Sequence, residues 1–170
     1  GDGAMADYVV VKEPYVYELP DYLSYETGAL IEPLSVATHA VRRAGIRLGE
    51  TVLIIGAGAI GMMVAAMCRR SGAAEVIIAD FSDQRLEMAK QVGATVTVNS
   101  GKEDLEQAVA RLTHGKGVDK SFECVGRESC FLQAIMTLKR NGTATIIGIY
   151  EKPQIQIPAS RFVTHEIHVQ

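Results

Sequence analysis

The sequence contains no basic tract, no long apolar run and no opening signal-peptide pattern. Its 17 lysine and arginine residues are outnumbered by 20 aspartate and glutamate residues, which gives a net charge of −3. Because no basic patch with interleaved aromatic residues is present, we expect no nucleic acid partner. The apolar runs have the length of strands, whereas a membrane span needs about 20 apolar residues. We therefore expect no membrane association, and no signal peptide opens the sequence.

Cysteine is also scarce. The three cysteines, Cys68, Cys124 and Cys130, have neither metal-site spacing nor the pattern of a disulfide framework. Their odd number and apolar surroundings predict reduced, mostly buried thiols, as in a cytoplasmic protein. The remaining composition, 48% apolar and 22% charged, is that of a globular domain, and 170 residues suffice for one domain with a proper core.

From residue 51 onward, strand-length apolar runs alternate with segments of helical periodicity. This alternation predicts an α/β fold, a parallel sheet covered by helices on both faces. Six strands in this order form the doubly wound Rossmann fold. Two serines, Ser82 and Ser100, are expected to cap helices. The predicted strands are residues 51–55, 75–79, 95–98, 119–123, 143–149 and 166–169, and the predicted helices are residues 59–71, 82–92, 102–113 and 128–139.

A glycine-rich turn connects the first of these strands to the first helix. Gly56, Gly58 and Gly61 have the spacing G-x-G-x-x-G, and Asp80 follows about 20 positions later at the end of the second strand. In this pattern the first glycine permits a tight turn, the second lets the backbone approach a pyrophosphate, and the third allows close helix–strand packing. The N-terminus of the helix then faces the phosphates. The pattern predicts a dinucleotide site.

Asp80 indicates which dinucleotide binds. A carboxylate at this position accepts hydrogen bonds from ribose hydroxyls and repels a 2′-phosphate, so NAD is favoured over NADP. A simpler interpretation stays open at this point: the glycines serve only as turns, and Asp80 caps the helix that starts near Ser82.

Residues 1–50 follow a different pattern. Residues 6–11 and 15–19 are predicted to be two short strands, and residues 24–45 a helix that Pro33 breaks after Glu32. The two strands have no obvious partners in a doubly wound sheet, and a lone pair of strands is only marginally stable. We therefore expect residues 1–23 to be trailing strands of another domain and residues 24–170 to form the dinucleotide-binding domain.

Three stretches carry a resemblance to a known family: residues 28–40, with Ile31-Glu32-Pro33-Leu34-Ser35-Val36, residues 52–61, and residues 80–94. Together they resemble the coenzyme-binding part of zinc-dependent medium-chain dehydrogenases/reductases, in particular the polyol (sorbitol or L-iditol dehydrogenase) branch. Residues 1–23 would then be the remnant of a missing barrel-like (GroES-like) catalytic domain.

The resemblance also implies an activity. Such enzymes oxidise a secondary alcohol, here an alcohol or polyol, to a ketone by hydride transfer to NAD, with zinc in the complete enzyme. It implies a homodimer or homotetramer through paired edge strands, and little or no turnover by this chain alone.

The same resemblance assigns individual residues. Glu32 is expected to face the catalytic zinc, directly or through its bound water, although an ordinary helix-end acid is the alternative. Arg85 is expected to contact the adenosine ribose, unless it only forms a surface ion pair with Asp83 or Glu87. The expected cofactor-binding residues are Val36, Gly56, Gly58, Ala59, Ile60, Gly61, Asp80, Phe81, Arg85, Cys124, Val125, Ile147, Gly148 and Ile149.

The histidines carry less weight. His165 and His168 have a ligand-like spacing but lie on a predicted strand, where side chains three positions apart point to opposite faces. We therefore expect no joint metal ligation by this pair, and His39 is expected to serve structure or a domain interface.

Two other functions remain open. One is a zinc-free, NADPH-dependent reductase of the quinone-reductase type, although Glu32-Pro33 and Asp80 argue against it. The other is a non-catalytic NAD-binding or dimerisation module, since an uncovered last strand is prone to pairing.

Overall fold

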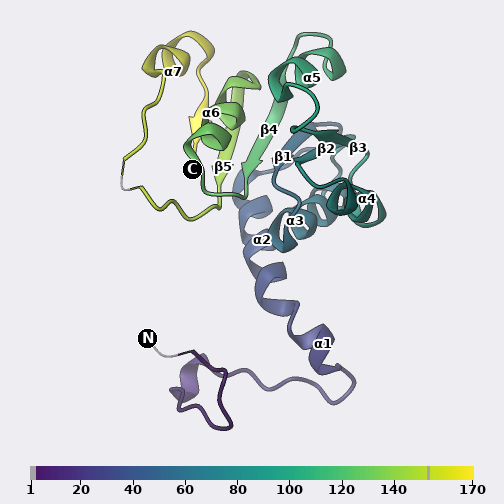
Figure 1. Cartoon of the computed structure of the whole chain (residues 1–170), viewed down its shortest axis with the longest axis vertical. Helices are drawn as coiled ribbons and strands as arrows, with labels where there is room; N and C mark the ends of the chain where they lie inside the picture. Colours follow the sequence, from purple (N-terminus) through teal and green to yellow (C-terminus); the bar gives the residue numbers. More distant parts are fainter. Residues whose placement is uncertain (1–2, 153) are drawn as a thin grey trace. The chain divides into compact units, whose positions relative to one another are not determined.

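The computed structural model describes residues 3–152 and 154–170, and a parallel sheet of six strands forms its centre (Figure 1). The strand order is β3-β2-β1-β4-β5-β6, and every neighbouring pair is parallel. This order confirms the predicted doubly wound Rossmann fold. The strands are β1 (Thr51–Ile55), β2 (Glu75–Asp80), β3 (Val96–Asn99), β4 (Val118–Glu123), β5 (Leu138–Ile146) and β6 (His168–Val169).

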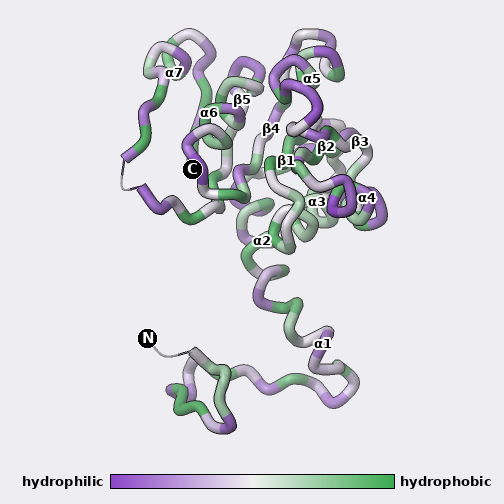
Figure 2. The backbone as a smooth tube through the Cα atoms, viewed as in Figure 1, coloured by the Kyte–Doolittle hydropathy of each residue, from purple (hydrophilic) through white to green (hydrophobic). Residues whose placement is uncertain are grey.

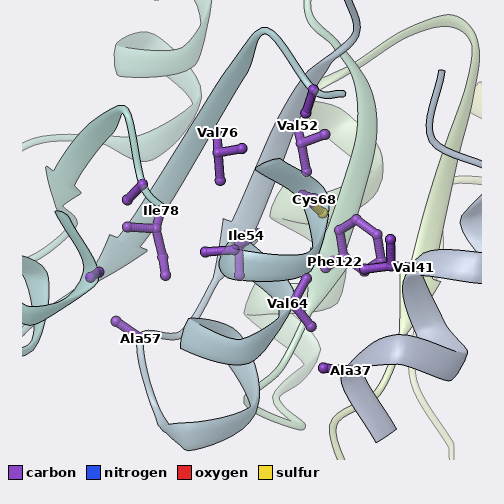
Figure 3. Close-up of a cluster of buried hydrophobic side chains, with 14 of the residues drawn as sticks. Ala37, Val41, Val52, Ile54, Ala57, Val64, Cys68, Val76, Ile78 and Phe122 are labelled. Atoms are coloured by element: carbon purple, nitrogen blue, oxygen red, sulfur yellow. The ribbon is translucent and has the colours of Figure 1, made fainter. Parts of the chain in front are cut away.

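Helices cover both faces of the sheet. One face packs against α2 (Ile31–Ala44), α3 (Ala59–Arg70) and α4 (Asp83–Val92), and the other against α5 (Leu105–Leu112) and α6 (Glu128–Met136). Alternate residues of β1 therefore enter different cores: Ile54 packs with Val64 and Phe122 on the first face (Figure 3), whereas Leu53 packs on the second. Because both of its faces are covered, β1 is hydrophobic along its length (Figure 2). Helix α4 buries only one side against the sheet, and it is largely hydrophilic.

Several element boundaries differ from the prediction. Helix α5 begins at Leu105 after the N-cap Asp104, whose side chain accepts a hydrogen bond from the Gln107 amide, so Ser100 is not its cap. The other predicted cap is confirmed, since Ser82 accepts from the Arg85 amide.

The last part of the chain also departs from the prediction. Strand β5 ends at Ile146, so residues 147–149 form a loop rather than the end of that strand. Helix α7 (Ala159–His165), which the sequence did not predict, precedes the last strand. The predicted strand 166–169 shortens to β6 because Glu166 adopts a left-handed conformation with φ 52°.

The N-terminal part forms a separate unit that ends at Ile31, and a second unit runs from Glu32 to Gln170. The two predicted leading strands are wrong: between residue 3 and residue 31 the structure has only a 3-10 turn (Glu13–Tyr15), the short helix α1 (Tyr25–Gly28) and the start of α2. Without a neighbouring strand, the backbone amides and carbonyl groups of such strands have no hydrogen-bond partners. Pro33 does not break the helix either, because α2 begins at Ile31 and a proline in the first turn loses no helical hydrogen bond.

Candidate functional site

The site is built around the turn between β1 and α3. Gly56 has a φ of +100°, and its amide donates to the Ala79 carbonyl oxygen at 2.8 Å, so the turn is fixed against the end of β2. A side chain at this position would lie 2.7 Å from a Val125 methyl group. A side chain at Gly61 would collide with the Gly56 carbonyl oxygen. Gly61 is thus required by its contact with the backbone of the turn, and Gly56 is required by its positive φ.

Gly58 meets a different demand. It is the N-cap of α3, and it offers no side chain to the unpaired amides of that helix. A Cβ atom built on Gly58 meets no protein atom within 4 Å. The first turn of α3 carries no acidic residue. The helix therefore directs amide donors and the positive end of its dipole at open space, an arrangement that suits a phosphate.

Asp80 lies at the end of β2 beside this turn. Its Oδ2 accepts a hydrogen bond from the Ala57 amide at 2.8 Å, and its Oδ1 accepts one from the Ser82 amide at 2.9 Å. The carboxylate is therefore held in place by backbone donors on both sides. A carboxylate has about four acceptor positions, so it can accept further hydrogen bonds from a ligand.

Arg85 is placed beside Asp80 rather than beside the two alternative partners. Its Nη1 lies 3.8 Å from Asp80 Oδ2, and 59% of its side chain is exposed. The alternatives are occupied, because Asp83 pairs with Lys102 and Glu87 pairs with Lys90. At this distance and exposure the ion pair is weak, so the guanidinium remains available for a ligand.

These groups surround one cavity. Its volume is about 400 Å³, and it opens at the carboxyl ends of β1, β2 and β4. This edge is where ligands of doubly wound sheets bind. Among the predicted cofactor-binding residues, the cavity is lined by Gly56, Gly58, Asp80, Phe81, Arg85, Cys124 and Val125. The predicted residues Ala59, Ile60 and Gly61 form the adjacent first turn of α3.

A second cavity, of about 520 Å³, lies between α2 and β5. It brings together Val36 and Ile147, two of the predicted cofactor-binding residues. His39 also lines it. Ile149, predicted with them, is 91% exposed and lines neither cavity. A further cavity of about 490 Å³ opens at the amino ends of β4 and β5, at the sheet edge opposite to the glycine-rich turn.

Sequence reasoning missed two residues at the carboxyl ends of the strands, Glu123 and Tyr150. Glu123 ends β4 and is fully buried. Its carboxyl group accepts hydrogen bonds from the amides of Val125 and Gly126, each at 2.8 Å, and from the Tyr150 hydroxyl at 2.8 Å. Burial and this hydrogen bond to Glu123 raise the pKa of Tyr150, which therefore remains a donor at neutral pH. The only sequence signal was an acid at the end of an otherwise buried strand.

The cysteines behave as expected of reduced thiols. All three are free; Cys68 and Cys130 are buried, and Cys124 is partly buried. Burial raises the pKa of Cys68 to about 12. For Cys124 and Cys130, burial is the main cause of a raised pKa, and the negative charge of Glu123 is the second cause. These thiols are poor nucleophiles and poor metal ligands.

The described residues do not form a zinc site. Within residues 3–152 and 154–170, no three histidine, cysteine, aspartate or glutamate side chains come together as a metal would require. Glu32 lies in the first turn of α2 with an exposed side chain. The strand argument about the histidines also needs correction, because His165 ends α7 and His168 lies in β6.

No helix in the described part of the chain has the length and apolar character that crossing a membrane requires.

The sheet order, the glycine-rich turn at the start of α3 and the acid at the end of β2 define a Rossmann-type dinucleotide-binding domain. The sequence profile of zinc-binding dehydrogenases matches residues 59–170, well over half of the chain. The chain belongs to the zinc-binding dehydrogenase family. The predicted resemblance to the coenzyme-binding part of such enzymes is confirmed.

Three known proteins illustrate the relationship. The chain is 34% identical to sorbitol dehydrogenase of Bacillus subtilis over 99% of its own length and 48% of the relative's. It is 39% identical to D-xylulose reductase of Saccharomyces cerevisiae, again over 99% of this chain and 48% of the relative. A solved dehydrogenase structure from Sinorhizobium meliloti with NADP bound superposes with a TM-score of 0.84 at 32% identity, over 90% of this chain and 46% of that one. The chain thus spans about half the length of these relatives.

Proposed function

We propose that this chain is the NAD-binding domain of a zinc-type dehydrogenase that oxidises a secondary alcohol, a polyol in the leading hypothesis, to a ketone. The observation that carries the proposal is the 400 Å³ cavity, whose wall is formed in part by Asp80, Gly56 and Gly58, the N-cap of α3. The amides of α3 suit a pyrophosphate, and Asp80 suits the hydroxyls of the adenosine ribose. NAD, when bound, would accept the hydride.

The choice of NAD over NADP rests on Asp80. A 2′-phosphate on the ribose would place a second negative group against this carboxylate, which two backbone amides hold in place. The solved relative with NADP bound shows that a similar fold accepts the phosphate, and Arg85 would be the residue to pair with it here. We propose that repulsion by Asp80 outweighs attraction by the exposed Arg85, because the weakly paired guanidinium is screened by water.

The reacting end of the cofactor belongs in the second cavity. There Val36 would pack against the nicotinamide ring, and Ile147 would lie beside its carboxamide. Gly148 and Ile149 lie in the loop that follows, outside this cavity, and we propose that their backbone approaches the same carboxamide when the cofactor is bound. Glu32 lies one helical turn before Val36, and we propose that it faces the alcohol and the zinc in a complete enzyme. The described residues bring no three possible metal ligands together, so this part of the chain does not provide a complete zinc site by itself.

Two broader expectations accompany this proposal. The partner would be a small alcohol or polyol in the cytoplasm, and the chain would associate through β6, the edge strand of its sheet. A non-catalytic dimerisation module is the second candidate function, and it is favoured by the same edge strand.

The test is a titration of NADH fluorescence with the wild-type chain, Asp80→Ala and Asp83→Ala. We expect Asp80→Ala to weaken NADH binding by about tenfold or more, because hydrogen bonds to a charged group contribute about 1.5–3 kcal/mol. Asp83→Ala is the matched control, since Asp83 is exposed and, among the described residues, its side chain pairs with Lys102 and Asn99. Equal affinity in all three proteins would remove Asp80 from the site, and tighter binding of NADPH than of NADH would contradict the choice of cofactor.

A further inference from the structure

The loops that follow β4 and β5 are joined by a single buried side chain. Glu123 Oε1 accepts the amides of Val125 and Gly126, in the loop after β4. Glu123 Oε2 accepts the hydroxyl of Tyr150, in the loop after β5. The backbone carbonyl oxygen of Glu123 also accepts the amides of Ile147 at 2.8 Å and Gly148 at 3.1 Å. One residue thus holds both loops.

The loops also touch each other through their backbones. A side chain at Gly126 would collide with the Ile149 carbonyl oxygen, and a side chain at Gly148 would collide with the Gly126 amide and lie 2.5 Å from Glu123 Oε2. The position of each loop therefore fixes that of the other. Tyr150 is anchored in turn against Phe131 of α6 by an edge-to-face contact, with ring centroids 6.4 Å apart.

Burying a carboxyl group is costly unless it is hydrogen-bonded. Glu123 is fully buried, and within the described chain no lysine or arginine forms an ion pair with it. Packing of β4 alone would be served better by an apolar residue such as its neighbour Phe122. Retaining a carboxyl group here makes physical sense if its acceptor pattern is needed to shape the two loops.

We propose that Glu123, with Tyr150, is a positioning residue that sets the nicotinamide half of the dinucleotide site without touching the cofactor. This inference rests on the proposed function. It assigns the adenosine half to Asp80 and the glycine-rich turn, and the geometry of the nicotinamide half to the hydrogen bonds of Glu123.

The experiment compares two ligands that share the adenosine half. NADH contains the nicotinamide and ADP-ribose does not, and both are titrated by calorimetry against the whole chain. Glu123→Met keeps the length of the side chain but removes both acceptor oxygens. We expect it to weaken NADH binding about tenfold or more and to change ADP-ribose affinity less than about twofold. It should also reduce the fluorescence enhancement of bound NADH, which reports the nicotinamide environment.

Two further variants separate positioning from folding. Glu123→Gln can still accept both backbone amides through its carbonyl oxygen and can donate to the Tyr150 oxygen, so we expect it to restore NADH affinity to within a few-fold of wild type. Ser121→Ala is the matched control, because Ser121 is equally buried in β4 but bonds to the Ala134 carbonyl oxygen, away from the loops. Its NADH to ADP-ribose affinity ratio should equal that of wild type.

The outcomes are distinct. If the wild-type chain binds neither ligand, the proposed function fails. If it binds both and Glu123→Met weakens both equally, or neither, the positioning role of Glu123 is wrong although the cofactor site stands. Should Glu123→Met fail to fold, Tyr150→Phe provides the test. A few-fold loss of NADH affinity with unchanged ADP-ribose affinity supports the proposal. A ratio of NADH to ADP-ribose affinity equal to that of wild type overturns it.

Discussion

At the scale of single residues, Gly58 and Gly61 show that one residue type meets two physical demands within four positions. A methyl group on Gly61 would enter the backbone of the turn, whereas a methyl group on Gly58 would enter open space. The first constraint comes from the fold itself. The second has no origin in the protein, and it is explained if a ligand occupies that space.

Alanine at each of these positions should therefore give opposite results. We expect Gly58→Ala to remain folded and to lose about tenfold or more in NADH affinity, because the added methyl group lies where the pyrophosphate should approach. Gly61→Ala should lower the free energy of unfolding by about 1–3 kcal/mol or more, because the helix must move away from the turn. Urea unfolding and NADH titration measure the two effects. Wild-type affinity in Gly58→Ala would argue against a phosphate beside Gly58.

The buried thiol of Cys68 provides a prediction on pH. Burial raises its pKa to about 12 from an ordinary value of 9.0, so above pH 9 the unfolded chain releases a proton that the folded chain keeps. Stability contributed by this thiol is full below pH 9 and falls as the pH rises from 9 toward 12, by up to about 1.4 kcal/mol per pH unit. The free energy of unfolding of Cys68→Ala should consequently fall less steeply between pH 9 and pH 11 than that of wild type. Parallel slopes for the two proteins would contradict this.

At the scale of elements, the strands and turns that depend on short local patterns could be predicted from the sequence. The strands of the doubly wound sheet and the turn at Gly56 could be predicted because apolar periodicity and glycine spacing act over a few residues. The leading strands failed because strand formation depends on partners, which a periodic pattern does not reveal. Helix α7 was hidden between Pro158 and a left-handed Glu166, and it is held by Arg161, which donates to the carbonyl oxygens of Met136 and Leu138.

The candidate site divides in the same way. Asp80 was predictable because it follows the glycines at a characteristic distance. The pair of Glu123 and Tyr150 was not, because their hydrogen bond joins the last residue of β4 to a residue 27 positions later, in the loop after β5. Such a contact becomes visible only when the sheet places β4 beside β5.

The start of α5 allows a direct test of a boundary that the sequence misplaced. Asp104 caps this helix by accepting the Gln107 amide at 2.8 Å, whereas Ser100 makes no cap. We expect Asp104→Ala to lower the free energy of unfolding by about 1 kcal/mol, the usual cost of a lost N-cap. Ser100→Ala should change it by less than about 0.5 kcal/mol. If chemical denaturation instead showed a larger loss of stability for Ser100→Ala than for Asp104→Ala, Ser100 would be the cap, as the sequence predicted.

At the scale of the whole molecule, the edges of the sheet determine how the chain can assemble. β6 is the last strand at one edge, and within the described residues it pairs only with β5. The amide of Gln170 donates to Ala144, and the amide of Ile146 donates to Gln170. Because alternate residues of a strand face opposite neighbours, the backbone of Val169 faces away from β5. An exposed edge of this kind can pair with a second copy.

Proline at residue 169 should separate assembly from folding. Val169→Pro removes an outward-facing amide and leaves the hydrogen bonds to β5 in place, so we expect the chain to remain folded and to bind NADH as wild type does. If copies associate through β6, this variant should sediment as a monomer at concentrations at which wild type is dimeric. Val169→Thr keeps the amide and a β-branched side chain, and it should still dimerise. A wild-type chain that is monomeric throughout would remove the edge-strand proposal, whereas a dimeric Val169→Pro would move the interface to another surface and leave the cofactor site unaffected.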